Sequence, residues 1–203
     1  MDWAVGLVKN AGEFLPFLVL VLWPVIPLWW IPVHGARELM RRIGLSRYPF
    51  IFVLWLPIAY LIYDNRGFLL EYRIHFPVTV MLTGISLGLT GIFLQLWALK
   101  ELTTKVITGV PEILNDPRSR LIVRGPFSHI RHPTYVSHTL MFAGVFLFSG
   151  VLATALVALI DFCIVSLIIV PMEEKELLQR FGDEYHSYMA RVPRFVPRIR
   201  GEV

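Results

Sequence analysis

The chain has 203 residues, of which 56% are hydrophobic and only 17% are charged. Soluble domains carry about 25% charged residues, so this composition and a mean hydropathy of +0.62 indicate an integral membrane protein. The net charge of +4 favours anionic lipid headgroups over nucleic acid as a partner, because the basic residues lack an extended soluble face. A single cysteine, Cys163, excludes a disulfide framework and a cysteine metal site, and we expect no metal.

Five apolar stretches can be interpreted as membrane-spanning helices, each of which needs about 17–25 mostly apolar residues. The chain starts without a basic region and a small-residue cleavage site, so we expect the first stretch to be retained rather than removed as a signal peptide. The predicted spans are residues 12–33, 49–63, 76–99, 133–148 and 151–172.

Two local features support the last three spans. Gly84, Gly88 and Gly91 give the third span a small-residue face suited to close helix packing. Residues 135–172 would measure about 57 Å as one helix, compared with a hydrocarbon core of about 30 Å. This stretch must therefore fold back, and the Ser149-Gly150 pair predicts a turn between two antiparallel helices.

Lysine and arginine are distributed unevenly between the loops. With the N-terminus outside, sixteen of the 19 lysines and arginines fall inside, and the positive-inside rule places the third loop and the C-terminal tail together in the cytoplasm. We predict an all-α polytopic protein with about five transmembrane helices, the last two forming a hairpin, followed by a cytosolic C-terminal helix. Residues 1–75 would form an N-terminal two-span region and residues 76–203 the core of one integral domain.

The segment "RHPTY", residues 131–135, combines charge with a helix start. Proline excludes its predecessor from a helix but suits the first helical turn, so we expect Pro133 to open the fourth span. The free backbone N–H groups there, together with Arg131, would form an anion site at the inner membrane surface, with Tyr135 one turn further in. The alternative is that Arg131 and His132 only extend to lipid headgroups.

Glu173 and Glu174 follow the fifth span directly. Adjacent helix residues point about 100° apart, so one acid can face a pocket while the other faces water. Acidic groups are unfavourable at the C-terminal end of a helix, which indicates a cationic partner. The alternative is a salt bridge to Arg131 or Lys175.

A tail helix is expected beyond the acid pair. Apolar and aromatic residues from Leu177 to Met189 recur on one face at helical spacing. We expect this helix to lie against the membrane or the third loop and to end at Pro193 and Pro197.

An anion-binding helix start opposite an acidic helix end would suit a zwitterionic ligand. The amino-acid end of S-adenosylmethionine is such a ligand, and a phospholipid headgroup is another. The segments "RGPFSHIRHPTY" and "EEKELLQRFGDEYHSYMARVPRFVP" together resemble membrane methyltransferases of the isoprenylcysteine carboxyl methyltransferase and phospholipid methyltransferase type, over about residues 95–200. This resemblance implies a helical enzyme with a cytosolic site for S-adenosylmethionine.

The resemblance also implies roles for individual residues. The catalytic residues that we expect from the RHPTY segment itself are Arg131, His132 and Tyr135. The cofactor-binding residues would be Ser119, Arg120, Leu121, Ile122, Phe127, His132, Pro133, Thr134, Tyr135 and Glu173. One departure concerns position 169, where the isoprenylcysteine enzymes have an arginine linked to the substrate carboxylate and this chain has Ile169.

The methyl acceptor stays open at this point. A prenylcysteine, phosphatidylethanolamine, a quinone-like phenol and a small thiol are all compatible with a lipophilic or lipidated substrate that enters between the spans. An amine or hydroxyl would need a general base, for which His132, His129 and His138 are candidates.

Two other classes compete with the methyltransferase. Membrane sterol reductases, which bind NADPH, end in a related helical arrangement, and a non-catalytic membrane subunit or transporter is the other alternative. Asp161 lies near the middle of the fifth span. We expect it to be protonated or bonded to a neighbouring helix, with substrate contact as the functional alternative.

Overall fold

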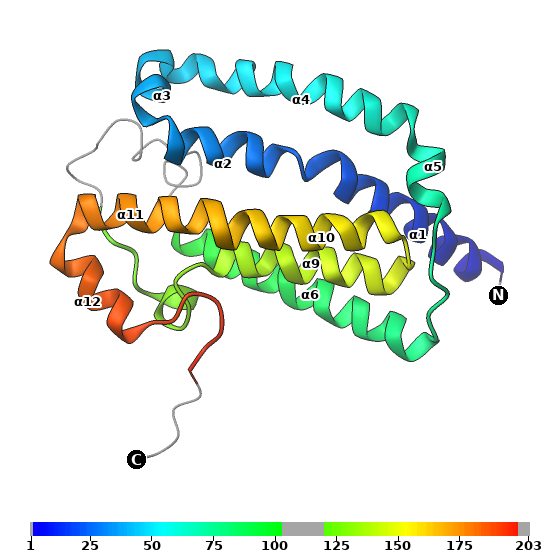
Figure 1. Ribbon diagram of the computed structural model, residues 1–203. Helices are drawn as coiled ribbons and strands as arrows, with labels where there is room; N and C mark the ends of the chain where they lie inside the picture. The colour runs from blue at the N-terminus through cyan, green and yellow to red at the C-terminus, as the bar shows by residue number, and fades with distance from the viewer. Residues whose placement is uncertain (1, 103–119, 199–203) are drawn as a thin grey trace.

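The computed structural model describes residues 2–102 and 120–198. Within these ranges the regular elements are helices, and the one extended pairing is a single antiparallel bridge between Arg73 and Val151. The long helices lie lengthwise against one another (Figure 1). In the described part of the chain, three helical stretches are long and apolar enough to cross a membrane, and they cover Lys9–Gly35, Val78–Glu101 and Leu152–Phe181. The prediction of a helical membrane protein is confirmed, while the number of five spans stays a prediction.

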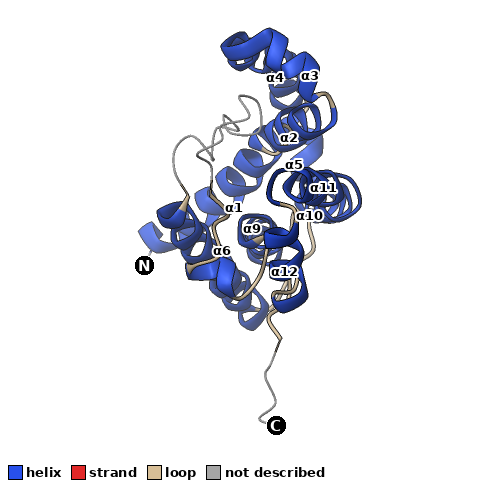
Figure 2. Ribbon diagram, turned by 90° about the vertical axis from the view of Figure 1, so that its left-hand side faces the viewer, coloured by secondary structure: helices blue, strands red, loops and turns tan. Residues whose placement is uncertain are grey.

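The N-terminal part of the chain runs along the bundle and then returns. α1 (Asp2–Leu22) and α2 (Val25–Gly35) follow one another with a break at Trp23 and Pro24, because proline lacks the backbone N–H that a continuous helix needs. The chain then turns through α3 (Arg37–Ile43) and η1 (Gly44–Ser46) and returns as α4 (Arg47–Asp64) and α5 (Arg66–Glu71). Figure 2 shows α4 on the far side of α2 from α9 (Pro133–Ser149) and α10 (Leu152–Ile164). The N-terminal helices that contact the rest of the bundle are therefore chiefly α1 and α2.

Glycines allow α6 (Val78–Glu101) and α9 (Pro133–Ser149) to approach closely. A Cβ atom on Gly84 would lie 2.7 Å from the carbonyl oxygen of Gly144, and one on Gly144 would lie 2.6 Å from the backbone nitrogen of Gly88. Such distances are far below ordinary van der Waals contact, so the two backbones touch through positions that have no side chain. The small-residue face predicted for the third span is therefore confirmed at Gly84 and Gly91, whereas a Cβ atom on Gly88 would enter open space.

The turn between α9 and α10 (Leu152–Ile164) lies where the sequence predicts it. Gly150 caps α9 with a φ of 73°, a left-handed conformation that favours glycine, and its N–H donates to Phe146 O at 2.7 Å. The turn also pairs with the second loop, because Ile74 N donates to Gly150 O and Leu152 N to Tyr72 O, both at 2.9 Å. The hairpin turn and the second loop therefore lie at the same end of the bundle.

The last long helix continues further than predicted. α10 passes through a π-helical turn, η3 (Val165–Ile169), directly into α11 (Val170–Phe181). The prediction of a single tail helix beyond the acid pair is wrong. Gly182, with a φ of 52°, ends α11, and α12 (Asp183–Arg191) leaves in a new direction (Figure 1).

The apolar residues that predicted one tail helix are brought together by tertiary packing between two helices. Tyr185 and Tyr188 of α12 are buried in a cluster with Leu177 and Phe181 of α11, so apolar residues of both helices meet although the helices are separate. Leu121 of the third loop packs against the same cluster. The expectation that the tail lies against the third loop is thus confirmed at this contact.

Candidate functional site

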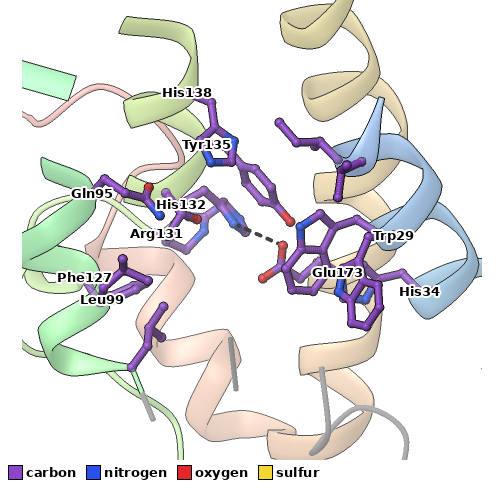
Figure 3. Close-up of a pocket in the computed structure, with 15 residues that line it drawn as sticks. Trp29, His34, Gln95, Leu99, Phe127, Arg131, His132, Tyr135, His138 and Glu173 are labelled. Carbon is purple, nitrogen blue, oxygen red and sulfur yellow. Dashed lines mark ion pairs between the residues drawn. The ribbon is translucent and has the colours of Figure 1, made fainter. Parts of the chain in front are cut away.

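A cavity of about 280 Å³ lies where α2, α6, α9 and α11 meet. Ligand pockets usually measure about 300–1,000 Å³, so this cavity is close to the size of a small-molecule site. Figure 3 shows its walls. The lining residues are Val25, Ile26, Trp29, Trp30 and His34 of α2, Gln95, Leu99 and Leu102 at the end of α6, Phe127 of η2 (Gly125–Ser128), Arg131, His132, Thr134, Tyr135 and His138 at and near the start of α9, and Glu173 of α11.

Glu174 is the centre of a buried ion-pair network behind this cavity. Its Oε1 lies 2.7 Å from Arg131 Nη2 and 3.2 Å from His132 Nε2, while Arg194 Nε donates to its Oε2 at 3.0 Å. Arg131 also donates through Nη1 to the carbonyl oxygen of Met189 at 3.2 Å. The expectation that the second acid faces water is therefore wrong, because three cationic or protonatable groups enclose Glu174.

This network corrects the predicted role of Arg131. Sequence reasoning assigned its charge to an anionic ligand, but the guanidinium is directed at Glu174, and the side chain of Arg131 is only 10% exposed. The alternative reading, a salt bridge between Arg131 and the acid pair, is the one that the structure supports. The sequence could not distinguish them, because both readings need the same two charges on the same side.

Glu173 occupies a different environment from its neighbour. Its carboxylate lines the cavity, and its Oε2 lies 3.6 Å from His132 Nδ1 (Figure 3). That oxygen is buried and has no hydrogen-bond partner within residues 2–102 and 120–198. A buried acceptor without a donor is costly, so this position suits a cationic or hydrogen-bonding ligand. The prediction that one of the two acids faces a pocket agrees with the place of Glu173.

The tail after α12 is hydrogen-bonded to the residues that precede α9, next to the cavity. Arg131 N donates to Pro193 O at 2.8 Å, and His132 N donates to Arg194 O at 3.2 Å. The hydrogen bond with Glu174 raises the pKa of Arg194 above its ordinary value, so the pair stays ionised. The tail after α12 is thereby fixed against the residues that precede α9.

α12 is held against η2 by a second contact. Tyr188 donates its hydroxyl to Phe127 O at 2.6 Å. Burial raises the pKa of Tyr188 above its ordinary value, which keeps the hydroxyl protonated and able to donate. Since Phe127 lines the cavity, this bond fixes one wall of the site.

α2 contributes a wall that sequence reasoning missed. Trp29 and Trp30 line the cavity, and the Trp30 ring stacks on His34 with centroids 5.4 Å apart. His34 Nδ1 lies 2.8 Å from Glu176 Oε2, and both side chains are buried. This pair connects α2 to α11, and only the tertiary contact reveals it, because 142 residues separate the two partners.

The structure gathers about half of the predicted site residues around the cavity. Those that line it are Phe127, Arg131, His132, Thr134, Tyr135 and Glu173. Arg120, Leu121, Ile122 and Pro133 are not among its described lining residues, and Ser119 lies outside the described part of the chain. The cofactor and catalytic roles of all the predicted site residues stay predictions, and for these five the support is the family resemblance without a place at the cavity.

Polar groups also line the end of the cavity inside the bundle. Gln95 of α6 accepts a hydrogen bond from Ser137 Oγ, and His138 lies one residue further along α9. His129, by contrast, is exposed, with its ring centroid 6.1 Å from that of Trp97. Asp161 accepts a hydrogen bond from Trp23 Nε1 at 3.0 Å, so the expectation that it is bonded to a neighbouring helix is confirmed.

The arrangement defines a helical membrane protein with a polar and aromatic cavity at one end of its bundle. Residues 79–184 match the family model described as phospholipid methyltransferase, which is half of the chain, and the chain belongs to this family. The predicted resemblance is therefore confirmed, and a family of methyltransferases implies an enzyme. The chain is also similar to the cobalt-zinc-cadmium resistance protein CzcN of Cupriavidus metallidurans, at 27% identity over 165 residues, which cover 80% of this chain and 68% of the relative.

Proposed function

We propose that the protein transfers a methyl group from S-adenosylmethionine to a lipophilic acceptor at the cytosolic face of the membrane. The observation that carries the proposal is the cavity lined by His132, Tyr135 and Glu173, all of which lie inside the family match at residues 79–184. The donor supplies a methyl group activated by a positively charged sulfur. The protein's own task is to bind, to align the two partners and to exclude water.

The residues present fit such a donor. Glu173 offers a buried carboxylate oxygen that lacks a hydrogen-bond partner among the described residues, which suits an ammonium group or a sulfonium. Trp29, Phe127 and Tyr135 add aromatic surface to the same cavity, and aromatic faces attract cations. The first turn of α9, at Thr134 and Tyr135, would present backbone N–H groups to the carboxylate of the amino-acid end, in place of Arg131.

The membrane topology belongs to the same proposal. Five spans, which correspond to α1 with α2, α4, α6, α9, and α10 with α11, would place the N-terminus outside and the tail inside. In support, the second loop pairs with the hairpin turn through Tyr72, Ile74 and Gly150, while the tail pairs with residues 131–132 next to the cavity. A five-span path requires this separation of the two ends.

Binding and transfer can be measured separately. Calorimetry of the purified protein in detergent should show heat of binding for S-adenosylhomocysteine, and labelled S-adenosylmethionine should transfer its methyl group to a component of native membranes. A folded protein that binds neither the donor nor its demethylated product contradicts the proposal. An NADPH-dependent absorbance change instead would support the reductase alternative, and inertness in both assays would support a non-catalytic subunit.

A further inference from the structure

His138 places a titratable ring at the inner end of the cavity. It lies five residues beyond the first residue of α9, which corresponds to about 7.5 Å along the helix axis. Its ring is held between Tyr135 and Phe142, with centroids at 6.3 Å and 6.2 Å respectively. An ionisable group at this depth in an apolar helix indicates a functional role unless a structural partner accounts for it.

No structural partner accounts for one of its nitrogens. Nδ1 of His138 is buried and has no hydrogen-bond partner in the described ranges, although His138 lines the cavity. Histidines that serve only the packing of a core satisfy their polar atoms, because an unpaired buried nitrogen is unfavourable. The position therefore fits a nitrogen that meets a hydrogen-bond donor brought in by a ligand.

The other two candidate bases are less suitable. His132 Nε2 lies 3.2 Å from Glu174 Oε1 and its Nδ1 lies 3.6 Å from Glu173 Oε2, so both of its nitrogens face carboxylates. His129 is exposed beside Trp97 and is not among the described lining residues. Of the three candidates, His138 is the one that lines the cavity and has a ring nitrogen without a hydrogen-bond partner among the described residues.

We propose that His138 is the general base for the methyl acceptor, and that the acceptor carries a protic nucleophile, namely a hydroxyl, thiol or amine, on a lipophilic body. The inference rests on the proposed function and specifies its substrate class. The acceptor loses its proton to the imidazole, its lone pair forms a bond to the methyl carbon, and the methyl–sulfur bond breaks with its electron pair left on sulfur. One positive charge moves from sulfur to the imidazolium, so the step is balanced.

The charges around the cavity agree with a protic acceptor. Arg131 is the arginine that lines the described cavity, and it is bound to Glu174. Ile169, at the position of the arginine in isoprenylcysteine enzymes, is fully buried in an apolar cluster with Tyr135. A carboxylate acceptor near these two positions would meet an arginine that is already paired with Glu174 and an aliphatic side chain. A neutral nucleophile needs no cationic partner.

The test uses four acceptors that share a dodecyl chain: dodecanethiol, para-dodecylphenol, dodecylamine and dodecanoic acid. Full-length protein in detergent should methylate at least one of the first three and leave the acid unlabelled. His138→Ala should lower kcat about 100-fold or more, added imidazole should restore part of the rate, and calorimetric affinity for S-adenosylhomocysteine should change little. The matched control is His129→Ala, which removes an exposed histidine that is not among the described lining residues, and it should behave as wild type.

The outcomes separate this inference from the proposed function. A wild-type protein that binds no S-adenosylhomocysteine contradicts both. A protein that binds it but labels only the acid, labels none of the three protic acceptors, or keeps its kcat after His138→Ala overturns the role of His138 alone. His138→Gln, which preserves size and polarity, repeats the test if the alanine variant does not bind S-adenosylhomocysteine, and the acceptor preference of the wild type decides the substrate class without any variant.

Discussion

Glu173 and Glu174 show how one helical step separates two functions. Glu174 lies among Arg131, His132 and Arg194, whereas Glu173 points into the cavity with one oxygen unsatisfied by the described residues. Both are acids at the same depth, so composition and charge patterning treat them alike. Their neighbours differ because of where α9 and the tail pack. The sequence of α11 alone carries no information about that packing.

Glu173→Gln should weaken the binding of the methyl donor. The substitution keeps the size of the side chain but removes the charge that faces the cavity, and hydrogen bonds to charged groups contribute about 1.5–3 kcal/mol. A loss of affinity of about tenfold or more is therefore expected, measured by calorimetry with S-adenosylmethionine. Glu184→Gln, in an exposed acid of α12, is the control and should leave the affinity unchanged.

Glu174→Gln should instead reduce stability. It leaves the buried guanidinium of Arg131 without its counter-charge, a change that costs about 3–5 kcal/mol at a buried pair. Because Arg194 is 44% exposed and can turn to solvent, we expect about 3 kcal/mol, at the lower end of this range. Chemical unfolding in detergent measures the difference, and equal stability of the Glu173→Gln and Glu174→Gln proteins would contradict the assignment of the ion pair to Glu174.

At the scale of the elements, local signals in the sequence were sufficient for the two ends of α9 but not for the cavity wall or for the end of α11 at Gly182. Pro133 opens α9 and Gly150 ends it, as proline and glycine chemistry predicts. The aromatic wall from α2 was missed, because Trp29 and Trp30 look like ordinary interface aromatics until the His34–Glu176 contact places α2 against α11. Long-range packing of this kind leaves no periodic signal in either helix.

The contact between α6 and α9 provides a stability prediction with an internal control. Gly84→Ala should destabilise the protein by about 1–3 kcal/mol, because the new Cβ would meet the backbone of α9 and force the helices apart. Gly88→Ala lies one turn away in the same helix, and its Cβ would enter open space. It should therefore be neutral or stabilise by up to about 1 kcal/mol through helix propensity. Thermal unfolding of the two variants in the same detergent checks the difference, and equal losses would exclude close backbone contact at Gly84.

At the scale of the whole molecule, the two ends of the bundle differ in chemistry. The second loop and the hairpin turn meet at one end, which carries the Arg73–Val151 bridge. The other end holds the cavity, the ion-pair network and α12. Charge counting predicted from sequence that the third loop and the tail share one side, and the hydrogen bonds between residues 131–132 and residues 193–194 place them together. The positive-inside rule predicts that the end with the cavity faces the cytoplasm, and this orientation stays a prediction.

Accessibility of single cysteines to a membrane-impermeant maleimide tests the orientation. The background is Cys163→Ser, which removes the one native cysteine. Gly67→Cys, in the exposed α5 beside the second loop, should react in intact cells, because the predicted five-span path would place this end outside. Ser187→Cys, exposed on α12, should react only after the membrane is permeabilised. Labelling of both residues in intact cells would contradict the assignment of these loops to opposite sides, and the reverse pattern would place the cavity on the outer face, away from cytosolic S-adenosylmethionine.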